Sequence, residues 1–118
     1  MTSYKPGQVV LIPFPFTDLS TNKQRPGVVI SSVPFNRSHP DVIIAAITSH
    51  LSSKPARDEH QLNETEQQSA GLPKPSTVKL GKIVTLDQRL IRRSLGQLPP
   101  ASTRGILDGI KQILSDSP

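Results

Sequence analysis

The sequence predicts a mainly β domain, a small and strongly bent barrel, followed by a C-terminal helix. Three observations favour this class: the apolar runs are short and rich in Val and Ile, prolines punctuate them, and helical spacing appears only near the end. Proline accounts for 12 of the 118 residues, about twice the usual share. Strand-like and helix-like patterns do not alternate, which argues against a parallel α/β sheet. This length predicts one domain over residues 1–118.

The predicted strands combine β-branched residues with flanking turn formers. Prolines lie at their margins, where the missing N–H of proline is tolerated in a sheet. Gly96 lies inside the last run and predicts a bend or bulge there. In chain order the runs are 9–12, 28–30, 42–47 and 78–84, with 90–98 as a candidate fifth.

The C-terminal part predicts an amphipathic helix over about residues 101–115. Ser102 or Thr103 is expected to cap its start, and the helix is expected to close one mouth of the barrel. Gly105 and Gly109 weaken it but would allow another backbone to approach closely. The apolar face consists of Ile106, Leu107, Ile110, Ile113 and Leu114.

The segment 51–71 is polar and shows no periodicity, apart from a possible short strand at residues 60–62. Its part 58–70 carries four acidic residues and no Lys or Arg. Because the net charge of the whole chain is +5, the remainder carries +9. Such a basic surface favours nucleic acid or an acidic partner, although it can also serve solubility alone. We expect the acidic segment to lie away from any groove that binds a nucleic acid.

Composition excludes several classes of site. The absence of Cys rules out disulfides and thiolate ligands, and only 3% of the residues are aromatic, which disfavours base-stacking platforms. Phosphate-binding glycine loops are absent, and the three histidines lack metal-ligand spacing, so we expect neither a metal nor another cofactor. No apolar run reaches the ~20 residues of a membrane span, and the start lacks a signal-peptide core. These features predict a cytoplasmic protein.

Two places could carry chemistry. Arg25 precedes Pro26, which favours an extended backbone at the start of the second run. Thr48, Ser49 and His50 end the third run. In an extended backbone Thr48 and His50 would point to one face and Ser49 to the other.

Five motifs in a fixed order resemble the MazF/PemK-like toxins of type II toxin–antitoxin modules, in particular a branch with a short first loop of the form PFPFTDL. The resemblance covers the chain from Gly7 to about Leu114. The motifs are Gly7–Leu19, Gln24–Ser31, Val42–Ser49, Ala70–Val78 and Leu95–Leu98.

This resemblance implies an SH3-like β-barrel with a C-terminal helix that acts as a homodimer. It implies a metal-independent endoribonuclease, an mRNA interferase that cleaves single-stranded RNA to a 2′,3′-cyclic phosphate and a 5′-hydroxyl. The implied partner is an antitoxin with an acidic tail. Arg25 and Thr48 correspond to the catalytic residues of the family. The apolar run 42–47 also suggests a strand that needs covering on both faces, as a dimer could provide.

Further site residues are expected around this pair. His50 is a possible acid or base, because imidazole is a side chain suited to proton transfer and the permanent charge of Arg25 suits phosphate binding better. Two alternatives remain open: a non-catalytic toxin on the same barrel, similar to the CcdB gyrase inhibitors, and an inactive nucleic-acid-binding module. The predicted RNA contacts are Lys23, Ser49, Lys74 and Ser76.

Overall fold

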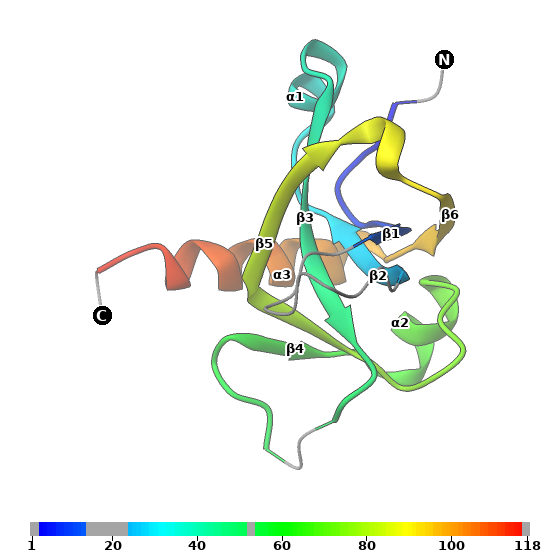
Figure 1. Ribbon diagram of the computed structural model, residues 1–118. Coiled ribbons are helices and arrows are strands. Elements are labelled where there is room, and N and C mark those ends of the chain that lie inside the picture. Colours follow the sequence, from blue (N-terminus) through cyan, green and yellow to red (C-terminus); the bar gives the residue numbers. More distant parts are fainter. Residues whose placement is uncertain (1–2, 14–23, 52–53, 117–118) are drawn as a thin grey trace.

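One six-stranded antiparallel sheet dominates the computed structural model, which describes residues 3–13, 24–51 and 54–116 (Figure 1). The strands follow the spatial order β4-β5-β3-β2-β1-β6. They are β1 (Gln8–Pro13), β2 (Gln24–Val29), β3 (Asp41–Thr48), β4 (Glu59–Gln61), β5 (Thr77–Asp87) and β6 (Arg93–Gln97). The helical segments are α1 (Val33–Ser38), α2 (Glu64–Ser69), the 3₁₀ turn η1 (Gln88–Leu90) and α3 (Pro100–Ile113). The predicted fold class, mainly β with a C-terminal helix, is confirmed.

Each predicted run overlaps an observed strand, and the short strand expected near residue 60 is β4. The runs 9–12, 42–47 and 78–84 lie within β1, β3 and β5, whereas 28–30 passes the end of β2 by one residue and 90–98 extends beyond both ends of β6. Its residue His60 pairs with Val78 of β5. The irregularity predicted near Gly96 is also present. Val9 of β1 pairs with Gly96 whereas the next residue pairs with Ser94, so one extra residue of β6 bulges out between them.

The sequence reading missed α1 and α2, which have six residues each. Helices of fewer than two turns are too short to display a periodic apolar face. The segment 51–71, expected to lack regular structure beyond a short strand, therefore also contains a helix. Helix α2 begins with a capping box, in which the Asn63 side chain accepts a hydrogen bond from the Glu66 N–H and the Glu66 carboxylate accepts one from the Asn63 N–H.

Helix α3 begins at Pro100, so the expectation of a Ser102 or Thr103 cap is wrong. Proline suits the first helical position because the N–H that it lacks would have no helical partner there. The Thr103 hydroxyl instead donates to the Pro99 carbonyl oxygen at 3.2 Å. The helix packs against β5 and lies behind the sheet in Figure 1.

The two helix glycines differ in their surroundings. A methyl group on Gly109 would lie 2.6 Å from Leu80 Cδ1, so this glycine does permit a close approach, although to a side chain rather than to a backbone. On Gly105 the nearest atom would be His60 Cε1 at 3.9 Å, an ordinary contact, so the expected close approach is wrong there. Along the predicted apolar face, Ile106 and Ile110 are buried whereas Leu114 is 76% exposed.

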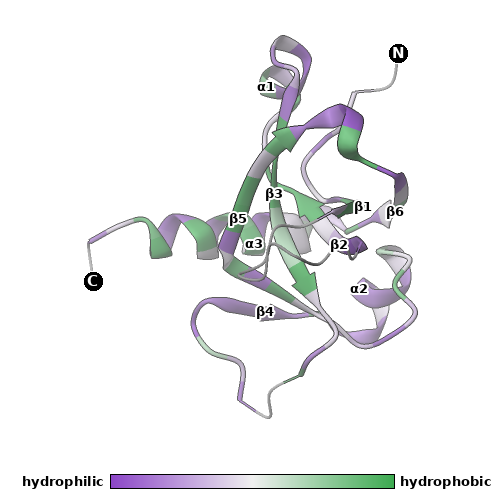
Figure 2. Cartoon of the chain, viewed as in Figure 1, coloured by the Kyte–Doolittle hydropathy of each residue, from purple (hydrophilic) through white to green (hydrophobic). Residues whose placement is uncertain are grey.

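Two apolar clusters cover the two faces of the sheet, and β3 contributes to both. Ala45 and Ile47 belong to the cluster that includes α3, and Val42 and Ile44 belong to the other. Figure 2 shows hydrophobic colouring along β3 and hydrophilic colouring on β4. Because one chain already buries both faces of β3, the burial of this strand does not itself require a second copy.

In the described ranges, no helix combines the length and the apolar character that crossing a membrane requires.

Candidate functional site

A cleft of about 730 Å³ opens where β2 and β3 stop pairing. The last paired residues are Gly27 and Ala46, yet both strands continue, β2 backward to Gln24 and β3 forward to Thr48. Extending the same antiparallel register would place Arg25 opposite Thr48. Both residues line the cleft, so the register accounts for their meeting at its edge.

Most of the predicted site residues line this cleft. Arg25, Thr48, Ser49, His50, Lys74 and Ser76 do so, joined by Leu11, Pro26, Ile47, Gly71, Leu72, Pro73, Arg93 and Leu95. They come from β1, β2, β6, the end of β3 and the segment 71–76 between α2 and β5. Lys23 lies outside the described residues.

The end of β3 turns immediately after Thr48. The His50 N–H donates a hydrogen bond to Thr48 Oγ1 at 3.1 Å, a local turn typical of Thr. The expectation that Thr48 and His50 share a face because the strand continues is therefore wrong, although both residues reach the cleft. Since Oγ1 accepts from the backbone, its own hydrogen remains available to donate to a ligand.

Ser76 shapes the wall of the cleft from a buried position. Its hydroxyl donates to the Lys74 carbonyl oxygen at 2.9 Å, which commits that hydrogen within the segment. Ser49, by contrast, is exposed beside Thr48. Of the two predicted serine contacts, Ser49 has the more accessible side chain.

The cleft has a positive lining. Arg25, Lys74 and Arg93 contribute cationic groups, and among the described residues that line it there is no Asp or Glu. The four acids of 58–70 are all outside the lining. Two of them have cationic or imidazole partners: Glu59 accepts from Lys79 Nζ at 2.8 Å, and Glu66 Oε2 lies 3.0 Å from His60 Nε2. The acidic segment thus contributes no carboxylate to the described walls of the cleft.

Sequence reasoning missed Arg93. This residue lies on β6 and pairs with Leu11 of β1, a contact between opposite ends of the chain that no local spacing reveals. The doublet of Arg92 and Arg93 in a predicted strand was the available signal, because alternation sends one of two neighbours to each face.

Two glycines join the walls of the cleft. Gly71 ends α2 with a positive φ of 71°, and a methyl group there would lie 2.0 Å from the Leu95 carbonyl oxygen. A methyl group on Gly96 would lie 2.3 Å from the Ser69 carbonyl oxygen. The backbone after α2 thus rests directly against β6, and this contact sets the distance between the 71–76 wall and the β6 wall.

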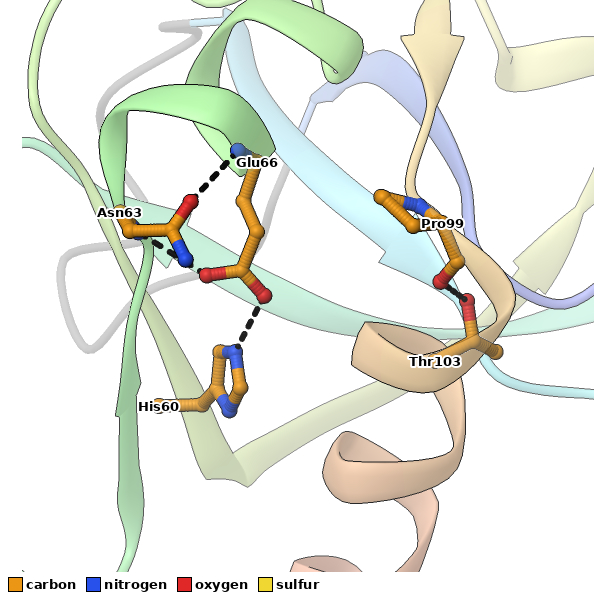
Figure 3. A network of polar contacts seen from close by, with 5 residues as sticks. All are labelled: His60, Asn63, Glu66, Pro99 and Thr103. Carbon is orange, nitrogen blue, oxygen red and sulfur yellow. Dashed lines mark hydrogen bonds and ion pairs between the residues drawn. The ribbon is translucent and has the colours of Figure 1, made fainter.

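A polar network holds α2 in place (Figure 3). The buried Glu66 carboxylate accepts from the Asn63 N–H at 2.9 Å, faces His60 on β4, and is hydrogen-bonded to Ser102 of α3. Burial acts to raise the pKa of Glu66, but the bonds from Ser102, Asn63 and His60 outweigh it and hold that pKa below its ordinary value. One carboxylate therefore links three elements beneath the cleft wall.

This network predicts an acid-dependent loss of stability. Because the folded-state pKa of Glu66 is the lower one, its contribution is complete above the unfolded-state value of 4.5 and is lost as pH falls through the folded-state value. We expect Glu66→Gln to lower the free energy of unfolding by about 1–2 kcal/mol at pH 7 and by less at pH 3.5. Urea unfolding of both proteins at the two pH values measures this. An equal loss at both pH values would refute the charge-dependent role of Glu66. Other acidic groups such as Glu59 and Asp87 are present in both proteins, so their titration cancels in the comparison.

Within the described ranges, no group of three His, Asp or Glu side chains is arranged to hold a metal ion.

Comparisons with known proteins agree on one fold. Residues 5–114 match the family model described as PemK-like, MazF-like toxin of type II toxin–antitoxin systems. No curated protein matches the chain in sequence. An endoribonuclease from a mycobacterial species superposes with a TM-score of 0.75 at 21% identity, over 100% of this chain and 98% of that one.

Two similar structures contain partners. A mycobacterial endoribonuclease solved with its cognate antitoxin has a TM-score of 0.74 at 20% identity, over 98% of each chain. A MazE–MazF structure from Deinococcus radiodurans has a TM-score of 0.74 at 20% identity, over 99% of this chain and 100% of that one. At these identities the likeness shows the fold.

Proposed function

This chain belongs to the PemK-like, MazF-like toxin family of type II toxin–antitoxin systems, and we propose that it is a metal-independent endoribonuclease that cleaves single-stranded RNA. The observation that carries the proposal is that Arg25 and Thr48 line the same positive cleft. A polyanion fits this lining, whose described residues include three cations and no carboxylate. The endoribonucleases among the similar structures support the same reading.

The proposed reaction needs only the groups of the cleft. The ribose 2′-oxygen attacks the phosphorus, the bond from phosphorus to the 5′-oxygen breaks, and a 2′,3′-cyclic phosphate and a 5′-hydroxyl result. A base takes the 2′-hydroxyl proton, and the leaving oxygen receives one. Arg25, planar and always charged, holds two phosphate oxygens as negative charge grows on them. The Thr48 hydroxyl donates to the same group, its oxygen held by the His50 N–H.

We assign the removal of the 2′-hydroxyl proton to His50, which lines the cleft next to Thr48, and the leaving 5′-oxygen takes its proton from water. His50→Gln keeps a polar side chain but cannot titrate, so we expect the rate to fall about 10²-fold and one limb of the pH–rate profile to disappear. Single-turnover rates between pH 5 and 9 measure this. A profile that keeps both limbs in His50→Gln would remove His50 from the mechanism and leave Arg25 and Thr48 in place.

The proposal includes partners. An acidic antitoxin tail would compete with RNA for the positive cleft, and two of the similar structures are described as complexes with an antitoxin or with MazE. We also propose a homodimer, as the family resemblance implies, acting in the cytoplasm where mRNA is found, with the described domain as its single folded unit. Ser49 and Lys74 are the proposed RNA contacts beside the catalytic pair.

Incubation of the protein with a long single-stranded RNA in EDTA tests the proposed function. Discrete fragments are expected without any divalent ion. Intact RNA across a range of sequences would contradict the proposal and favour a toxin that acts on a protein target. Binding without cleavage would favour a nucleic-acid-binding module.

A further inference from the structure

We propose that Arg93 binds a second RNA phosphate, distinct from the one held by Arg25 and Thr48, so that the cleft grips the strand at two phosphates. This inference rests on the proposed function and extends it to a residue on another strand of the sheet. Arg93 is exposed on β6 and lines the cleft.

The strand order separates the two positions. Arg25 lies on β2, next to the open end of β3, whereas Arg93 lies on β6, on the far side of β1. Two strand spacings amount to about 10 Å. The register of β2 and β3, extended beyond its last pair, places Arg25 opposite Thr48 at the open end of these strands, and both line the cleft. Arg25 pairs with Ile12 and not with Leu11, so a phosphate held by Arg25 and Thr48 lies away from the row that contains Arg93. Arg93 is then placed for a different phosphate.

The register turns Arg93 toward the cleft. Arg93 and Pro26 both pair with Leu11, from β6 and β2 respectively, and directly opposed residues share a face of the sheet. All three line the cleft. Leu11 and Pro26 form an apolar row beside the guanidinium, and a nucleobase between two bound phosphates can rest on such a row.

The charge of Arg93 is available for a ligand. Arg89, a few residues earlier, is held by the Asp87 carboxylate at 3.0 Å. Arg93 takes part in no such ion pair with any residue that the structure describes. Because no described carboxylate occupies it, the planar guanidinium of Arg93 can bind two oxygens of a phosphate.

The neighbouring Arg92 provides a matched control. Arg92→Ala removes the same charge one residue away, from a side chain that does not line the cleft. The hydrogen bond of Arg92 to the Leu11 carbonyl oxygen uses its backbone N–H and survives the change. Any difference between the two alanine variants thus reports on position rather than on net charge.

The test uses single-stranded RNA with 2′-O-methyl riboses, which binds but cannot be cleaved by the proposed route. We expect Arg93→Ala to weaken binding about tenfold or more at low salt and to lower the slope of log affinity against log salt by about 0.7. Arg92→Ala should change affinity less than threefold. Equal losses in the two variants would overturn the role of Arg93.

A methylphosphonate scan then locates the contact. One uncharged linkage is placed at each position around the mapped cleavage site. At one position outside the scissile phosphate, the linkage should weaken binding of wild type and Arg92→Ala but leave Arg93→Ala unaffected. If every linkage weakens all three proteins equally, Arg93 holds no particular phosphate. These binding results stand apart from the EDTA cleavage assay, so RNA binding without cleavage would refute the nuclease alone.

Discussion

Arg25→Ala is expected to lower the rate of RNA cleavage by about 10²–10³-fold or more, because it removes the group that neutralises charge on the phosphate in the transition state. Arg25→Lys should recover only a small part of this, since a lysine ammonium cannot hold two oxygens in the planar, bidentate manner of guanidinium. Single-turnover rates at saturating protein separate this effect from weaker RNA binding.

Arg104→Ala is the control for the loss of one positive charge. Arg104 is exposed on α3 and lies outside the cleft lining, so its removal should change the rate less than threefold. Arg25 is itself exposed, and its variants are expected to unfold at the same urea concentration as the wild type within error. A rate for Arg25→Ala within threefold of Arg104→Ala would contradict the assignment.

Gly71→Ala should be the most destabilising of the small substitutions, by about 3 kcal/mol. Two costs add: the positive φ of 71° disfavours any side chain, and the new methyl group would lie 2.0 Å from the Leu95 carbonyl oxygen. The nearest atoms, the carbonyl oxygen and carbon of Leu95, belong to the backbone, so they cannot move aside by a side-chain rotation. A loss of this size is a large fraction of the stability of a small domain.

Gly81→Ala is the matched control, because a methyl group there meets no atom of the described residues within 4 Å. It should leave stability unchanged or raise it slightly, since alanine restricts the unfolded chain. Urea unfolding followed by far-ultraviolet circular dichroism measures both variants, the chain having no Trp for fluorescence. Equal midpoints for Gly71→Ala and Gly81→Ala would show that the contact between α2 and β6 does not hold the cleft walls together.

Local signals in the sequence predicted much of the fold. The apolar runs later seen as β1, β3 and β5 were readable because β-branched residues cluster between turn formers. The short helices were not, although the spacing of Asn63 and Glu66 was a capping signal that could have marked α2. At α3 the proline pair at 99–100 determines where the helix starts. Ser102 and Thr103, the expected caps, form hydrogen bonds to Glu66 and to the Pro99 carbonyl oxygen instead.

The cleft was only partly predictable, because strand pairing brings its residues together. Arg25 and Thr48 came from the family motifs, and the register between β2 and β3 accounts for their proximity. Arg93 and Leu11 are paired across almost the whole chain, so no spacing argument could have joined them. The fit of Gly71 against Leu95 depends on the same long-range pairing and is equally invisible in the sequence.

The chemical nature of the RNA ends produced in EDTA tests the central claim most directly. An RNA that contains one mapped cleavage site is compared with the same RNA carrying a single 2′-deoxyribose at the scissile nucleotide, and the products are identified by mass spectrometry. We predict a 2′,3′-cyclic phosphate and a 5′-hydroxyl from the first RNA and no cleavage at that site in the second. A 3′-hydroxyl with a 5′-phosphate, or cleavage of the deoxy substrate at the same position, would contradict the account.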